Sequence, residues 1–288
     1  MIALSESAPI NAEWLRQRYA KLREEHEHLH LPQAAAMLKV PEEALIASRL
    51  DGFGAVRLRP EPEAVLAALT ELGKLLIAVL HPAGVLIGIA PSLSLARESR
   101  LLCLEGPNLA LRVDPHAVHR LYLLHEEHGP HGRERHVLAY DRLGERLWTV
   151  LVLYKRHAAD FARLGERFRD PDQGWHGEFA SEPPEAIPAL PEEADDCSLE
   201  ALKEGVSALA AGLMCVEARR GGVELRVQAE RPRLRAEPEG YLHLDHAELK
   251  LHSALARYRR CWRLGRSYIV RDEGGTRELL FAPGRTRP

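Results

Sequence analysis

The sequence has few cysteines and no long apolar run. Only four cysteines occur in 288 residues, and none forms a CxxC pair, which argues against a disulfide framework or a thiolate zinc site. No stretch approaches the ~20 apolar residues that a membrane-spanning helix needs. The amino terminus has no basic region followed by an apolar stretch, so it does not resemble a signal peptide. We therefore expect a cytoplasmic protein with no membrane span.

An excess of charge of either sign is also lacking. Lys and Arg number 39 and Asp and Glu 42, which leaves a formal net charge of −3. This balance provides no long-range attraction for phosphate backbones or anionic membranes, so nucleic acid is not an expected partner. A hydrophobic content of 45% and a charged content of 28% are ordinary for a globular chain.

The pattern of apolar residues predicts helices followed by an antiparallel meander. Helical spacing, N-cap residues and first-turn prolines predict helices over the ranges 11–30, 32–39, 41–48 and 60–74. Between residues 75 and 154, short alternating or β-branched runs are separated by turn-like segments, which is typical of a meander. The range 157–168 returns to helix, and a proline-rich acidic linker follows.

The pattern then repeats. The segment 74–87 matches 212–225 at an offset of 138, and 108–112 matches 248–252 at an offset of 140. Asp141-x-x-Gly144-x-Arg146 matches Asp272-x-x-Gly275-x-Arg277 at an offset of 131. Because order is kept and the drift falls in turns, we infer a duplicated unit. The prediction is an α+β fold in which two like meander sheets pack as a pseudo-dimer. Its parts are a first repeat (11–173), a linker (174–197) and a shortened second repeat (198–288).

Three segments of the first repeat resemble the hemin-degrading factor family, the HemS/ChuS-type cytoplasmic haem transport and utilisation proteins. They are AAAMLKVPEEALI (34–46), ASRLDGFGAVRL (47–58) and ADFARLGERFRDPDQ (159–173). The resemblance covers nearly all of residues 11–173 and, more faintly, 198–288. It implies a pseudo-dimeric HemS/ChuS-like fold. It also implies a protein that stores, traffics or weakly degrades haem in iron acquisition, with a haem-transport protein or a haem oxygenase as a possible partner.

The resemblance also implies how haem would be held. In the family, haem lies between the sheet and helices of one half, with an axial histidine near the start of the second half and arginines at the propionates. Such a site needs an imidazole, cations and a dry apolar wall. In this chain the helices that carry that histidine are missing, because the linker runs directly into SLEALKEG (198–205). Leu86, Arg226 and Lys250 stand where the family has histidines.

Five residues remain as candidates for a haem site. His26 is the candidate iron ligand, and we expect it on the apolar stripe of helix 11–30. His81 aligns with a family arginine. Arg219, Arg220 and Arg226 lie around the second hairpin and could hold carboxylates as forks. Each candidate also has a structural interpretation. His26 could be a hydrogen-bonded core histidine, His81 a turn residue, and the three arginines a hairpin edge whose charge prevents strand pairing.

Three other hypotheses stay open. The run His125-x-x-His128-x-x-His131 resembles a metal-binding loop, although loop histidines without oriented carboxylate partners bind metal weakly. Residues 32–50 resemble a helix-turn-helix, but Glu42 and Glu43 would repel phosphate. Finally, the missing helices and substituted histidines favour a diverged paralogue that lost haem. Such a paralogue would use the same scaffold for another hydrophobic small molecule or for a protein.

Overall fold

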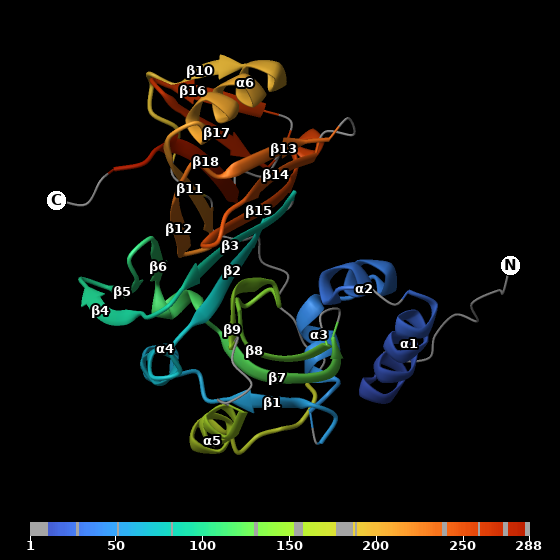
Figure 1. Cartoon of the computed structure of the whole chain (residues 1–288). Helices are drawn as coiled ribbons and strands as arrows, with labels where there is room; N and C mark the ends of the chain where they lie inside the picture. Colours follow the sequence, from blue (N-terminus) through green and yellow to red (C-terminus); the bar gives the residue numbers. More distant parts are fainter. Residues whose placement is uncertain are drawn as a thin grey trace, which may run out of the picture.

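Two nine-stranded antiparallel sheets form the body of the protein, with helices at their faces and ends (Figure 1). The computed structural model describes residues 11–26, 29–50, 52–81, 83–129, 132–152, 158–176, 187, 189–237, 241–258, 260–272 and 276–285. This arrangement confirms the predicted α+β fold built from two meander sheets.

Six helices occur among the described residues, and the side chains of Asn11 and Ser198 cap the starts of two of them. They are α1 (Ala12–Glu25), α2 (Leu31–Leu38), α3 (Glu42–Ala47), α4 (Pro62–Thr70), α5 (Ala158–Phe168) and α6 (Leu199–Ala210), with 3₁₀ turns η1 (Pro115–Ala117) and η3 (Leu255–Arg257). Asn11 Oδ1 accepts a hydrogen bond from the Trp14 N–H at 2.9 Å, and Ser198 Oγ accepts one from the Ala201 N–H at 3.1 Å. No helix in the described ranges is long and apolar enough to cross a membrane.

Each sheet contains strands from both halves of the chain. The first sheet runs in the order β1 (Ala55–Leu58), β7 (Arg120–Gly129), β8 (Gly132–Tyr140), β9 (Arg146–Val152), β2 (Leu75–His81), β3 (Gly84–Ala90), β15 (Leu249–Ala254), β14 (Tyr241–Asp245), β13 (Arg233–Ala236). The second runs in the order β10 (Asp195–Cys197), β16 (Arg260–Leu264), β17 (Ser267–Arg271), β18 (Arg277–Pro283), β11 (Leu213–Arg220), β12 (Val223–Glu230), β6 (Leu109–Val113), β5 (Leu101–Glu105), β4 (Ser94–Glu98). We call them sheet 1 and sheet 2.

The duplication is confirmed in the order of the strands. Strands β2 to β9 correspond one to one with β11 to β18, and η1 with η3. The starts of β2 and β11 differ by 138 residues, those of β6 and β15 by 140, and those of β9 and β18 by 131. These are the offsets that the sequence repeat predicts. In addition, the last residues of the expected linker form the short edge strand β10.

An exchange of strands joins the two copies, and the sequence pattern did not reveal it. The strands β4, β5 and β6 leave their own copy and complete sheet 2, where β6 pairs with β12. In return β13, β14 and β15 complete sheet 1, where β15 pairs with β3. Neither sheet therefore consists of one copy alone, and the backbone hydrogen bonds of each half depend on the other.

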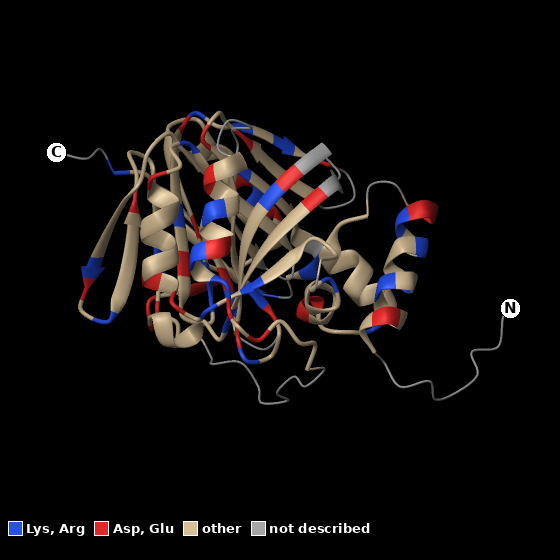
Figure 2. Cartoon of the chain, turned by 90° about the horizontal axis from the view of Figure 1, so that it is seen from below, with Lys and Arg blue, Asp and Glu red and all other residues tan. Residues whose placement is uncertain are grey.

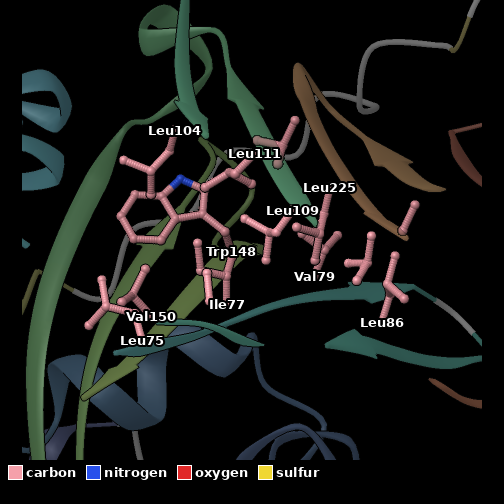
Figure 3. Close-up of a cluster of buried hydrophobic side chains, with 14 of the residues drawn as sticks. Leu75, Ile77, Val79, Leu86, Leu104, Leu109, Leu111, Trp148, Val150 and Leu225 are labelled. Atoms are coloured by element: carbon pink, nitrogen blue, oxygen red, sulfur yellow. The ribbon is translucent and has the colours of Figure 1, made fainter. Parts of the chain in front are cut away.

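The main core lies between the two sheets. Alternate residues of β2, such as Leu75, Ile77 and Val79, are completely buried, as expected of strands that present one face to a core. Trp148 of β9 is also completely buried, and Figure 3 shows its indole beside Leu104 of sheet 2. An aromatic side chain of this size is among the largest single contributions to such a core.

A second, smaller core lies on the other face of sheet 1, where α1 to α3 cover β7 and β8. It contains Leu15, Leu45 and Ile46 from the helices and Tyr122 and Tyr140 from the strands. Glu43 of α3 is completely buried, and its Oε1 accepts hydrogen bonds from Tyr122 at 2.7 Å and from Arg120 at 2.9 Å. The helices that resemble a helix-turn-helix are therefore sheet-packing helices, with an acidic residue as their anchor.

Gly88 of β3 faces the main core at a point where the two sheets approach closely. A Cβ at this position would lie 2.2 Å from Leu109 Cδ1 and 2.8 Å from Val227 Cγ2, both in sheet 2. We expect Gly88→Ala to lower the free energy of unfolding by about 1–3 kcal/mol, because overpacking forces neighbouring side chains to shift. Denaturant unfolding would measure this loss. Gly212→Ala is the matched control, since its Cβ would meet nothing within 4 Å; an equal loss in both variants would contradict the expected contact.

Candidate functional site

Two adjoining cavities share the turn that leads into β1, and we call them the helix-1 lobe and the helix-5 lobe. The helix-1 lobe has a volume of about 470 Å³ and is lined by Tyr19, Arg23, Arg49, Gly52, Phe53, Gly54, His125 and Glu126. The helix-5 lobe has a volume of about 780 Å³ and is lined by Gly52, Gly54, Ala55, Val56, Leu123, His125, Arg135, Ala158, Ala159, Phe161, Ala162, Gly165, Glu166 and Arg169. Gly52, Gly54 and His125 line both lobes, so the two cavities adjoin at these residues, and we call the pair the two-lobed cleft.

The helix-5 lobe is mainly apolar because α5 presents small residues to it. Ala158, Ala159, Ala162 and Gly165 lie along this side of the helix, opposite β-strand residues such as Leu123. A Cβ at Gly165 would already lie 3.2 Å from Leu123 Cδ1, so the helix packs closely there. The small side chains leave a slot with apolar walls, and its polar groups are an imidazole, one carboxylate and two guanidinium groups.

The helix-1 lobe is polar, and Arg49 organises it. Its Nη1 lies 2.6 Å from Glu126 Oε1, its Nη2 donates to the His125 carbonyl at 3.4 Å, and its Nε donates to the Phe53 carbonyl at 3.3 Å. One guanidinium therefore fixes the turn before β1 to strand β7. Burial raises the pKa of the nearby Tyr19 hydroxyl, and the Glu126 carboxylate adds to the rise.

Glycine is required in this turn. Gly52 has a φ of 95° and Gly54 a φ of 97°, which side chains with a Cβ rarely adopt. The Gly54 carbonyl accepts a hydrogen bond from the His125 N–H at 2.8 Å, so the turn is joined to the strand that carries the imidazole. Residues 52–54 thus form the bend at which the two lobes adjoin.

His26 lies just outside this cleft. Helix α1 ends at Glu25, and the His26 N–H donates to the Leu22 carbonyl at 2.9 Å as the C-cap of the helix. The expectation that His26 falls on the apolar stripe is wrong, because its side chain is exposed whereas Leu15 and Tyr19 are buried. It lies about one turn from Arg23 of the helix-1 lobe. His81 ends β2, and its side chain lies outside the described residues.

The three candidate arginines of the second hairpin lie on two different faces of sheet 2. Arg219 and Arg226 lie on the outer face of sheet 2, whereas Arg220 points to the opposite face, where it pairs with Glu145 of the first copy. Glu145 also pairs with Arg277. Burial lowers the pKa of Arg220 to about 10, and the neighbouring Arg277 contributes to the fall. The interpretation as a charged sheet edge is also wrong, since β11 and β12 are both internal strands.

On the outer face of sheet 2, arginine and glutamate alternate across five neighbouring strands. The row consists of Arg112 (β6), Glu224 (β12), Arg219 (β11), Glu278 (β18) and Arg271 (β17), and each is the register partner of the next. The N···O distances along the row are 3.4, 3.2, 3.3 and 2.7 Å. Arg226 instead donates to Cys215 Sγ at 3.1 Å. Carboxylates of the chain itself thus surround Arg219.

This charged row lies on the outer face of sheet 2, which no described helix of the second copy covers. The α6 helix, which is the helix of the second copy among the described residues, contributes Leu202 and Val206 to the core between the sheets. Elsewhere acidic and basic residues are interspersed along the strands and helices, as Figure 2 shows. Ion pairing thus balances charges on the outer face of sheet 2. In sheet 1, α1 to α3 cover the outer face at β7 and β8, whose counterparts in sheet 2 are β16 and β17.

The metal-loop hypothesis receives no support from the described residues. His125 belongs to β7, but the side chains of His128 and His131 lie outside the described part of the chain. No group of three or more His, Cys, Asp or Glu side chains able to hold a metal ion occurs among the residues that the structure describes.

Sequence reasoning missed the residues that line the cleft. His125 was considered only as part of a loop, and Arg23, Arg49, Arg135 and Arg169 were not singled out as a group. Arg49 stands inside ASRLDGFGAVRL, the most specific motif of the first copy, so that motif could have indicated its position. The other three are separated by up to 146 positions, and only the fold brings them to one cleft.

We expect Arg49→Ala to lower the free energy of unfolding by about 3 kcal/mol, because the buried Glu126 carboxylate loses its charged partner. Glu126 is only 7% exposed. The double variant Arg49→Ala/Glu126→Gln should recover at least about 1 kcal/mol of this loss, since a neutral amide costs less to bury. Denaturant unfolding of the set measures both effects. The control is Lys21→Ala, which breaks an exposed ion pair with Glu25; a loss as large as that of Arg49→Ala would contradict the role of burial.

Comparison with known proteins gives matches among solved structures. No protein-family model matches the chain, and no curated protein matches it. The structure is similar to that of holo-PhuS, a heme-binding protein from Pseudomonas aeruginosa, with a TM-score of 0.82 and 20% sequence identity over 97% of this chain and 95% of PhuS.

It is also similar to the heme-degrading enzyme ChuS of Escherichia coli O157:H7. The TM-score is 0.81 and the sequence identity 14%, over 96% of this chain and 95% of ChuS. At such identities the likeness concerns the fold, and it extends over almost the full length of both chains. The protein therefore has the α+β pseudo-dimeric fold of PhuS and ChuS, as the resemblance in its sequence implied.

Proposed function

We propose that this protein binds haem in the two-lobed cleft of its first copy and acts in the cytoplasm in haem storage or trafficking for iron acquisition. The observation that carries the proposal is the junction at His125 between an apolar slot and a lobe lined by arginines. The fold shared with PhuS and ChuS, a haem-binding and a haem-degrading protein, supports it.

The residues of the cleft fit the chemical demands of haem. The macrocycle needs flat apolar walls, which the alanines of α5 and Leu123 offer in a cavity of about 780 Å³. The iron needs an imidazole, and His125 is our candidate ligand. The propionates need cations, and Arg135 and Arg169 line the same lobe. Haem bound there would be the cargo of the protein.

The earlier candidates enter the proposal in secondary roles. His26, about one turn beyond Arg23, is the second candidate for the iron ligand, approaching from the helix-1 lobe. His81 is retained only as a residue that could approach a propionate. Arg219, Arg220 and Arg226 would have to give up contacts within the chain to bind propionates, and for Arg219 and Arg220 these are ion pairs. We therefore assign these arginines to the scaffold.

A second function follows from the second copy. Its uncovered sheet face balances its own charges, which favours a paralogue that lost the family's site in that half. In that case the cleft of the first copy would hold another hydrophobic small molecule, or the surface would bind a protein. If the protein binds haem and passes it on, its partner would be a haem-transport protein or a haem oxygenase. Weak haem degradation would be assayed by adding a reductant to the haem-loaded protein.

Titration with hemin tests the iron ligand. We expect a Soret band that saturates at one haem per chain, with binding tighter than about micromolar. His125→Ala should weaken binding at least about tenfold, which is about 1.4 kcal/mol, and His26→Ala should have a smaller effect. His116→Ala is the control, because His116 is exposed on η1 and does not line the cleft. Weak unsaturable binding by the wild type would reject haem and favour the second function.

Filling the slot tests its location. Ala162 of α5 lines the helix-5 lobe and is exposed, so Ala162→Trp should fill the slot without disturbing the core. We expect it to weaken hemin binding at least about tenfold, because the introduced indole would occupy the part of the helix-5 lobe that the haem macrocycle needs. Arg163→Trp is the matched control at the next, exposed position of the same helix. If both variants bind hemin like the wild type, haem lies elsewhere.

A further inference from the structure

Two cysteines far apart in the sequence meet at the edge of sheet 2. Cys197 ends the edge strand β10, and Cys261 lies on β16, where the two are register partners in an antiparallel pair. Their Sγ atoms are 2.9 Å apart across a sequence separation of 64 residues. Both are free thiols in this structure. The scattered spacing of the four cysteines gave no sign of this pair.

The backbone geometry already suits a disulfide bond. Residues directly opposite each other on antiparallel strands have Cα atoms about 4.5 or 5.5 Å apart, and both values fall within the range of about 4.4–6.8 Å found in disulfides. A disulfide has an S–S length of about 2.05 Å, so the sulfurs need to approach by less than ~1 Å. No rearrangement of the sheet is required.

Accessibility separates this pair from the other two cysteines. Cys103 and Cys215 are 1% and 3% exposed, and Cys261 is 8% exposed, whereas Cys197 is only half-buried. Cys197 is therefore the thiol that a solution oxidant reaches first. Burial raises the pKa of the Cys261 thiol, and the neighbouring Cys197 and Asp196 add to the rise, which disfavours the Cys261 thiolate.

We propose that Cys197 and Cys261 are a redox modification site, which a peroxide converts into a reversible disulfide between β10 and β16. In the first step the Cys197 thiolate attacks one oxygen of hydrogen peroxide, and the O–O bond breaks. Cys197 becomes a sulfenic acid, and the hydroxide that leaves takes up the proton lost by the thiol and becomes water. In the second step Cys261 sulfur attacks the sulfenic sulfur, gives up its proton and expels the oxygen as water. Two thiols and one peroxide thus give one disulfide and two waters, and a dithiol reverses the reaction.

The position of the bond gives it a structural effect. Strand β10 has three residues, and Asp195 and Asp196 are exposed, so few interactions hold this edge. The next residue, Ser198, is the N-cap of α6, the helix that covers the core side of sheet 2. A disulfide at Cys197 would therefore fasten both the edge strand and the start of α6 to the sheet.

The disulfide also closes a long loop. A cross-link over 64 residues removes conformations from the unfolded chain, and the stabilisation grows with loop length. In a reducing cytoplasm such bonds are usually transient and redox-sensing. We infer that the second copy exists in a looser reduced form and a fastened oxidised form. The reaction needs neither haem nor the cleft of the first copy.

The test is oxidation of the full-length protein with hydrogen peroxide. We expect free thiols to fall from four to two, and the intact mass to fall by that of two hydrogen atoms. Peptide mapping without reductant should find a cross-linked pair containing Cys197 and Cys261. The thermal midpoint should rise by at least about 5 °C and return to its original value with dithiothreitol.

Single serine variants identify the pair. Cys197→Ser and Cys261→Ser should each lose the cross-linked peptide and the thermal shift, whereas Cys215→Ser, on the internal strand β11, should keep both. The wild-type peptide map alone decides the assignment even if a variant folds poorly. The proposal would be overturned if the oxidised wild type contained no such cross-link and Cys197 were found instead as a higher oxide or in disulfide-linked dimers. A thermal shift that persists in Cys197→Ser would also overturn it.

Discussion

The exchange of three strands between the copies is the constraint on which the rest of the structure depends. Through the ladders β3–β15 and β12–β6, each copy completes the sheet of the other, so neither sheet exists without both. The buried faces of the two sheets then form one continuous core with Trp148 among its largest side chains. The fold therefore depends on the strands that both halves supply, since each half contributes three strands to the sheet of the other.

The two copies differ in the helices that cover their sheets. In the first copy, helices lie on both faces of sheet 1 near β1, β7 and β8. Helices α1 to α3 lie on the outer face, and α5 lies beside β1 on the core side. The cleft lies between these helices and the turn before β1. On the outer face of sheet 2, the second copy instead carries a row of paired arginines and glutamates. No described helix of that copy covers this face, and the ion pairs balance its charges.

Several features of the fold were predictable because they depend on local sequence. Alternating runs indicate the meander, helical spacing indicates the helices to within a few residues at their starts, and repeated turn motifs indicate the duplication. Asp141 and Asp272 illustrate the last point, because each accepts backbone hydrogen bonds within its own tight turn. The position of His26 was wrong for a related reason: helical spacing continued past Glu25, but the helix itself ended there. The period of the apolar residues indicates which face of a helix a residue would occupy, but it does not determine the residue at which the helix ends.

The sequence by itself therefore determined the class of fold, the order of most of its helices and strands and the likeness to haem-handling proteins, since each of these follows from patterns within a few dozen residues. Only the tertiary structure decided which strands pair across the copies. It also decided which arginines are bound by the chain's own carboxylates, that His125 joins two lobes, and that Cys197 faces Cys261. The physical reason is that these contacts join residues far apart in the chain, and their partners are set by sheet register and helix packing.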